Sequence, residues 1–313
     1  MAQASIERGG LTLEDLGGNR KRHRKERVVR RVFLTAALLS IAISVAIVAS
    51  LAGGTIDYLS KVEFSQMLVM DWFPRRNEFG LPAILAGTLV VSLIAMVVAA
   101  PLGLGAALYL SEFAKPRSRR MLKPILETLA SVPSVVMGFF ALRFISPDIV
   151  QKLFGGAEFF NFLAAGIGVG LLVTPLVASV AEDAMHAVPS GLREASFGLG
   201  AKLRTTSLKI VVPAAVSGIT AALILGISRA IGETMIVAIA AGGTGGSGFN
   251  LDPLRGGQTM TAAITSLATG SDRAAGSGAA VPSLYFVGML LFFMTLGLNL
   301  FSERFVRRVR RRY

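Results

Sequence analysis

The chain has 313 residues, of which 53% are hydrophobic and only 16% are charged, with a formal net charge of +13. This apolar composition excludes an ordinary soluble domain. The chain has no cysteine, which excludes disulfides and thiolate metal sites, and its only imidazoles are His23 and His186, so we expect no metal site and no cofactor.

Uncharged runs long enough to cross a bilayer recur along the chain. Crossing the hydrocarbon takes about 20 apolar residues, and a shorter run at 128–142 can be extended at both ends. If the run at 210–228 continues through Arg229 and Glu233, the sequence predicts an all-α polytopic membrane protein with six transmembrane helices. The remaining runs are 32–56, 79–111, 159–181 and 274–302.

The lysines and arginines concentrate in alternate segments between these runs. Of 32, 24 lie in residues 1–32, 112–124, 181–209 and 304–313, and only six lie in the other connections. By the positive-inside rule, this asymmetry predicts that both termini are cytoplasmic. It also assigns the basic N-terminal segment to orientation and contact with membrane lipid, and we expect no nucleic-acid partner.

The predicted organisation follows these runs in chain order. Residues 1–31 are expected to form a flexible basic cytoplasmic tail, 32–56 the first transmembrane helix, and 57–83 an extracytoplasmic loop. Residues 84–302 form the core, in which Pro101 and Pro133 are expected to kink helices and small residues allow close packing. Residues 303–313 form a second basic tail. We expect aromatic residues near the first loop to lie at the membrane interface, namely Tyr58, Trp72 and Phe73.

The loop before the fifth span contains a short helix that its own loop cannot cover. Ser190 is the expected N-cap, and Gly198 and Gly200 end the helix and allow a sharp turn. Spacing of i, i+3, i+4 and i+7 gives the helix one face of low polarity, which indicates a surface offered to a soluble partner. The residues of that face are Leu192, Ala195, Ser196 and Leu199.

This loop, 193–213, resembles the EAA loop of the permeases of bacterial ABC importers. The matching positions are Glu194, Ala195, Ser196, Gly200, Ile210, Val212 and Pro213, with Ser196 in place of the second alanine and Val212 in place of the common leucine. The resemblance implies that the helix docks in a cleft of an ATP-binding subunit. The glycine-rich stretch 242–250 lacks the Gly-Lys-Ser/Thr ending of a phosphate-binding P-loop, so ATP is expected to bind another chain.

Four further stretches resemble the permeases of the phosphate-specific importer, of the PstC type more than the PstA type. They are 79–114, 129–139, 227–242 and 257–264, and the resemblance covers about 80–302. It implies a type I (MetI-like) ABC-importer permease core in a bacterial inner membrane, and a transport subunit that is not itself an enzyme. The implied partners are a PstA-like second permease, two PstB-like ATP-binding subunits and an extracytoplasmic PstS-like phosphate-binding protein, which the outer loops are expected to contact.

Two charges lie in the fifth span, where a charge at the bilayer centre costs roughly 2.5–3.5 kcal/mol. Arg229 and Glu233 are four residues apart, so we expect one helical face and an ion pair. A helix starting near Lys209 would place Arg229 in its outer half or at its outer end, unless the helix tilts or breaks at Gly226 or Gly232. We expect the pair to line the anion path near the outward entrance, with Thr234 as a further donor. The competing interpretation is an arginine that marks the membrane boundary.

Other functions remain open at this stage. Within the class, the chain could be a permease for sulfate or molybdate, or the partner phosphate permease. A secondary anion transporter or channel would use Arg229 and Glu233 for proton coupling or gating, but it would not need the EAA-like loop. A non-transporting scaffold explains neither the loop nor the charges, and the sequence contains no apparent nucleophile–base pair for an intramembrane enzyme.

Overall fold

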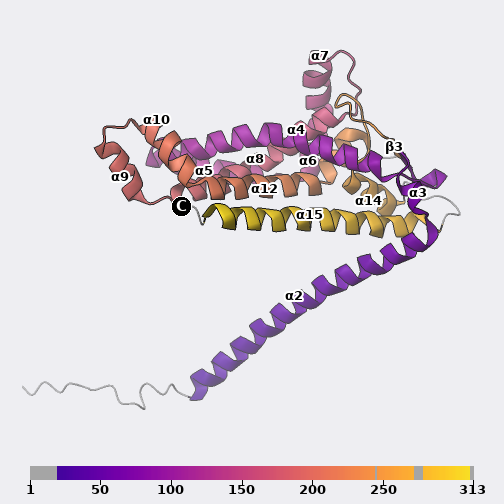
Figure 1. The fold of residues 1–313 in the computed structure, drawn as a ribbon, viewed down its shortest axis with the longest axis horizontal. Coiled ribbons are helices and arrows are strands. Elements are labelled where there is room, and N and C mark those ends of the chain that lie inside the picture. The colour runs from indigo at the N-terminus through magenta and orange to yellow at the C-terminus, as the bar shows by residue number, and fades with distance from the viewer. Residues whose placement is uncertain (1–19, 244, 271–277, 311–313) are drawn as a thin grey trace, which may run out of the picture. The chain divides into compact units, whose positions relative to one another are not determined.

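The computed structural model describes residues 20–243, 245–270 and 278–310, and nearly all of its elements are helices (Figure 1). The chain divides into two compact units, one ending at Ser50 and the other beginning at Leu51. Among the described residues, five helices are long and apolar enough to cross a membrane, and a bent helix pair makes a sixth when it is counted as one crossing. The predicted all-α polytopic fold is therefore confirmed.

The first crossing belongs to helix α2 (Arg20–Lys61). Its apolar side chains are mostly exposed, such as Phe33 at 70%, as expected of a helix that lipid surrounds. The helix begins at Arg20 because the Lys, Arg and Glu residues before the apolar run are good helix formers. The described part of the predicted flexible tail 1–31 is therefore helical, and residues 1–19 lie outside the described residues.

Five further crossings make up the second unit. Between the second and third of the six lies the amphipathic helix α5 (Pro116–Ala130). The crossings are α4 (Leu81–Leu108) with η2 (Tyr109–Phe113), α6 (Ser134–Phe140) with η3 (Ala141–Val150) and α7 (Gln151–Leu153), α8 (Phe162–His186), the pair α10 (Leu203–Thr206), η4 (Ser207–Val211) and α11 (Val212–Ala214) with α12 (Val216–Gly232), and α15 (Ala280–Arg310).

Of the two prolines expected to kink helices, one lies inside a helix and the other does not. Pro101 lies inside α4, which continues to Leu108. Pro133 is not within a helix, because α5 ends at Ala130 and Pro133 is the residue before the first residue of α6. The lack of an amide hydrogen suits a proline to a helix start. The predicted run 128–142 therefore straddles a break between two helices.

Helices α4 and α8 pack closely because glycines lie where they touch. A Cβ on Gly103 would lie 2.8 Å from a Val177 methyl carbon, and one on Gly170 would lie 2.8 Å from the Ala95 carbonyl oxygen. Small residues at helix contacts let backbones approach closely in membranes. The α4–α8 pair therefore forms the packed centre of the second unit.

Replacing Gly103 with leucine is expected to prevent folding of the second unit. No flexible side chain can move aside there, because Val177 and the Thr174 carbonyl oxygen bound the space. Gly105, on the same helix, has nothing within 4 Å of a built Cβ, so Gly105→Leu is the matched control. The measurement is the yield of monodisperse protein in detergent. Equal yields of the two variants would contradict this account of the packing.

A three-stranded antiparallel sheet in the order β2-β1-β3 lies at one end of the second unit, hereafter the sheet end (Figure 1). Its centre is Trp72, which is opposite Phe79 on one side and Ser247 on the other. The sheet thus joins the loop 57–83 to the loop that follows the fifth crossing. Its elements and their neighbours are α3 (Phe64–Met67), β1 (Asp71–Phe73), η1 (Pro74–Arg76), β2 (Glu78–Phe79) and β3 (Ser247–Gly248).

Two of the aromatic residues expected at the membrane interface are buried instead. Trp72 and Tyr58 are both 0% exposed. Tyr58 stacks on Phe286 with ring centroids 4.8 Å apart, and Trp72 meets Phe79 edge-on. The prediction was wrong because pairing of the two loops creates a small core that sequence spacing does not reveal.

Candidate functional site

The predicted docking helix is α9 (Ser190–Gly198), at the end of the second unit opposite the sheet, hereafter the α9 end (Figure 1). Ser190 is its first helical residue; Pro189 is the N-cap, so the predicted serine cap is wrong. Gly200 has a φ of +79°, a left-handed conformation that glycine adopts without steric cost. The predicted sharp turn after the helix is present.

Most of the predicted face of α9 is open. Leu199 is 90% exposed and Leu192 is 45% exposed, and Ala195 and Glu194 are also exposed. Phe197, which the spacing argument omitted, adds a further apolar side chain at 45% exposure. Apolar side chains gathered on one exposed helix are typical of an interaction surface.

Ser196 departs from this pattern. It is only 8% exposed, and its hydroxyl oxygen lies 2.8 Å from that of buried Thr206 in α10. Ser196 is therefore not on the outward face of α9 but holds the helix to the start of the next crossing. Of the four residues predicted to form one exposed face, three are therefore exposed, and Ser196 is buried because it packs on α10 of its own chain.

The remaining EAA-like positions lie at the start of the fifth crossing. Ile210 belongs to η4 and Pro213 to α11, both partly buried. Directly after them, at Ala215, the crossing bends by 71° between Leu203–Ala214 and Val216–Gly232. A proline close to the break accounts for the bend, since it removes a helical hydrogen bond. The EAA-like segment therefore leads from α9 into a bent helix.

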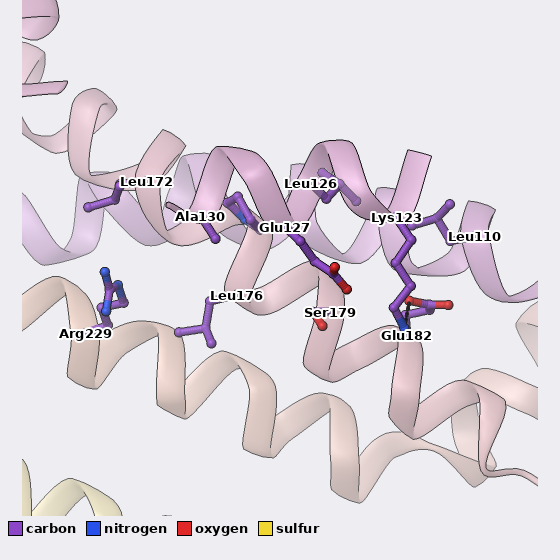
Figure 2. A pocket seen from close by; sticks show the side chains of 11 residues that line it. Leu110, Lys123, Leu126, Glu127, Ala130, Leu172, Leu176, Ser179, Glu182 and Arg229 are labelled. Atoms are coloured by element: carbon purple, nitrogen blue, oxygen red, sulfur yellow. Dashed lines mark ion pairs between the residues drawn. The ribbon is translucent and has the colours of Figure 1, made fainter. Parts of the chain in front are cut away.

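A cavity of about 300 Å³ lies between α5, α8 and α12 (Figure 2). Arg229 lines one end of it, near Leu172 and Leu176, and Lys123 and Glu182 line the other end, nearer α9. The rest of its lining is Leu110, Leu126, Glu127, Ala130, Pro175 and Ser179. The cavity thus combines two cationic and two acidic side chains with apolar walls.

Arg229 lies in the last turn of its helix, α12, as predicted, but that turn is not at the outer end of the bundle. Leu172 and Leu176 are near the middle of α8, so Arg229 lies level with the middle of the bundle. The crossing bends at Ala215 and α12 already ends at Gly232, so the outer end of this helix lies part-way along the bundle. Arg229 is exposed within this single chain. An exposed arginine at that depth needs either water or a partner beside it.

The predicted ion pair between Arg229 and Glu233 is absent from the described residues, and the two do not share one helix. Helix α12 ends at Gly232, and Glu233 has an extended backbone with φ −69° and ψ 128°. Its carbonyl oxygen accepts a 2.8 Å hydrogen bond from the Thr261 hydroxyl of α14 (Met260–Thr269). The Thr234 hydroxyl donates to the Gly232 carbonyl oxygen at 3.3 Å. Helix resumes in α13 (Met235–Val237) and η5 (Ala238–Gly242).

A buried carboxylate that sequence reasoning missed anchors α5 to α8. Glu182 is 1% exposed; its Oε1 accepts hydrogen bonds from Arg119 at 2.6 and 2.9 Å, and its Oε2 forms an ion pair with Lys123 at 3.0 Å. Each carboxylate oxygen thus has its own cationic partner from α5. The signal available in the sequence was an acidic residue within the apolar run ending at His186.

Replacing Glu182 with leucine is expected to destabilise the protein by about 3 kcal/mol, because it strands two cations beside an apolar helix. Asp183, whose side chain is 68% exposed and which pairs only with Lys123 at 3.3 Å, supplies the control Asp183→Leu. Thermal unfolding of both variants in detergent is the measurement. A Glu182→Leu midpoint at or above that of the control would contradict the anchoring role.

Comparison with known proteins identifies the family to which these features belong. The family described as the inner membrane component of binding-protein-dependent transport systems matches residues 99–313. The probable ABC transporter permease protein YqgH of Bacillus subtilis is 34% identical over 74% of this chain and 76% of its own. The phosphate transport system permease protein PstC of Pasteurella multocida is 28% identical over 93% of this chain and 94% of its own.

Two solved structures show the fold. A bacterial alginate ABC transporter in complex with its periplasmic protein contains a chain that superposes with a TM-score of 0.63, covering 91% of this chain and 97% of its own at 16% identity. The inward-facing MetNI methionine ABC transporter gives a TM-score of 0.52 at 20% identity over 72% of this chain and 91% of its own. The predicted MetI-like permease core is therefore confirmed.

Proposed function

The chain belongs to the family of inner membrane components of binding-protein-dependent transport systems, and we propose that it is the permease subunit of an ATP-driven phosphate importer. The observation that supports phosphate as the substrate is the series of related phosphate transport permeases of the PstC type. The match to that of Pasteurella multocida covers 93% of this chain. A second, from Mesorhizobium japonicum, is 31% identical over 71% of it. Family membership supports a transport role without bond chemistry in this chain.

The α9 end is the proposed cytoplasmic side, where two copies of an ATP-binding subunit drive transport and one docks on α9. The basic segments 112–124 and 181–209 both lie at this end, as the positive-inside rule requires. Exposed Leu192, Phe197 and Leu199 offer apolar contacts to a cleft. The lysines and arginines of 1–32 and 304–313 support, by the same rule, cytoplasmic termini.

The sheet end is the proposed extracytoplasmic side, where a phosphate-binding protein docks. The pairing of β1 with β3 supports this role, because it joins the predicted outer loop 57–83 to the loop that follows the fifth crossing. A second, PstA-like permease would close the path beside α12. Exposed Arg229 supports that pairing, since lipid is a poor neighbour for a guanidinium.

Arg229 is the proposed phosphate contact in the path. A guanidinium binds phosphate oxygens through strong charge-assisted hydrogen bonds. In the same cavity, Lys123 is already neutralised by Glu182, so Arg229 is the cation left to attract the anion. Glu127, another lining residue, lowers the local positive charge, which keeps binding weak enough for release. Glu233 and Thr234 lie at the following helix break and are the proposed continuation of the path.

The experiment that tests this function is transport by the complete assembly. The chain, its second permease, the ATP-binding subunits and the binding protein are reconstituted in vesicles, and ATP-dependent uptake of labelled phosphate is measured against excess sulfate or molybdate. We expect accumulation that neither competitor reduces. Uptake that sulfate or molybdate abolishes would replace phosphate by that oxyanion, and phosphate flux without ATP would indicate a secondary transporter or channel.

A further inference from the structure

One arginine on α9 links this helix to the ends of two crossings. The Arg193 guanidinium donates to Glu112 Oε1 at 2.9 Å, to the Met185 carbonyl oxygen at 2.9 Å and to the Val188 carbonyl oxygen at 2.6 Å. Glu112 belongs to η2, which continues α4, and Met185 lies in the last turn of α8. Three acceptor groups, at the ends of two crossings and just after α8, thus bind a single side chain.

The Arg193 contacts are shielded from water and are separate from the exposed docking face. The Glu112 side chain is 3% exposed and that of Arg193 is 20% exposed. The Ser111 hydroxyl donates a further hydrogen bond to Glu112 at 2.8 Å, which fixes the carboxylate. An ion pair held in one geometry by several hydrogen bonds transmits displacement better than an exposed pair, which exchanges with water.

The two crossings that Arg193 contacts, α4 and α8, are also packed tightly against each other, so we expect them to move together. Helices α4 and α8 are in close backbone contact through Gly103 and Gly170. Packed helices shift as rigid bodies more readily than they deform. On its other side α9 is held to α10 by the neutral Ser196–Thr206 contact, which leads to the bent fifth crossing. The charged link and the neutral link therefore lead to different crossings.

We propose that Arg193 is the positioning residue that carries the displacement of α9 to the α4–α8 pair during the transport cycle. This inference rests on the proposed function, since an ATP-binding subunit must move α9. The role requires arginine, because its planar fork can serve the carboxylate and both carbonyl oxygens at once. A lysine can neutralise Glu112 but cannot hold three acceptors in that geometry.

The first test is Arg193→Lys in the reconstituted assembly, scored as phosphate transported per ATP hydrolysed. We expect that ratio to fall roughly fivefold or more, which is the lower range of coupling effects, while the subunits remain associated and ATP hydrolysis continues. Arg117→Lys, at an exposed arginine for which the structure gives no ion pair, is the matched control. A ratio for Arg193→Lys within twofold of the parent would overturn the inference.

The second test needs no transport measurement. Because the chain has no cysteine, spin labels can be placed at Gly191 in α9 and Leu102 in α4 without background. If the link is rigid, the distance between the labels stays the same with and without bound nucleotide, and Arg193→Lys makes it change. A distance that already changes in the parent assembly would refute the linkage. An assembly that carries no phosphate would instead contradict the proposed function and leave this distance test standing.

Discussion

Arg229→Gln is expected to lower ATP-dependent phosphate uptake roughly tenfold to a hundredfold, which corresponds to the loss of about 1.5–3 kcal/mol from a hydrogen bond to a charged group. The glutamine keeps much of the side-chain volume but cannot attract an anion at the centre of the bundle. Initial uptake rates in vesicles, at equal amounts of assembled complex, give the measurement. Arg229→Lys, which keeps the charge, should retain part of the activity.

The same experiment tests whether Glu233 acts with Arg229. Since no described ion pair joins the two side chains, Glu233→Gln and Arg229→Gln should reduce uptake independently, and their free-energy effects should add. Coupled effects would indicate that the two side chains meet in another state of the cycle. Undiminished uptake in Arg229→Gln would remove Arg229 from the path.

Leu199→Asp is expected to abolish stable association with the ATP-binding subunit. Leu199 is 90% exposed at the end of α9, so the substitution costs the isolated chain almost nothing, but it would place a charge in an apolar cleft of the partner. Glu194→Lys tests the same face by reversing an exposed charge. The measurement is co-purification of the ATP-binding subunit from membranes, followed by its ATPase rate.

The control for the docking surface is Leu68→Asp at the sheet end, where Leu68 is 58% exposed. It introduces the same charge at an exposed leucine far from α9 and should leave association with the ATP-binding subunit intact. Normal association in Leu199→Asp, or its loss in both variants, would contradict the assignment of α9 as the docking helix.

Much of the fold was predictable because each membrane crossing corresponds to a continuous run of apolar residues in the sequence. The six crossings, the short helix before the fifth of them and the sharp turn after that helix all followed from composition, spacing and glycine placement. These features depend on residues that are close in sequence, so periodicity and turn chemistry are sufficient to find them.

The helix breaks were not predictable, since distant contacts stabilise them. The interruption at Glu233 depends on Thr261, 28 residues away, whose hydroxyl donates to the freed carbonyl oxygen. The burial of Ser196 likewise depends on Thr206. The sequence allowed a break at Gly226 or Gly232 but could not decide between that and a regular helix through 210–233, and the regular helix led to the wrong pairing of Arg229 with Glu233.

The ion pairs of Glu182 and Arg193 were also not predicted from the sequence. Glu182 meets residues of α5 about sixty positions earlier, and Arg193 meets Glu112 81 positions earlier. Nothing in the local pattern distinguishes these charged residues from the exposed ones around them. Only the folding of α5 and α9 against α8 brings the charges together.

The most direct test of the central claim, that a separate ATPase drives this bundle through α9, is phosphate accumulation in vesicles with and without the ATP-binding subunits. With the complete assembly and ATP, phosphate should accumulate against its gradient, and removal of the ATP-binding subunits or of ATP should stop the flux. Phosphate transport by the purified chain alone, at the rate of the complete assembly, would contradict the claim.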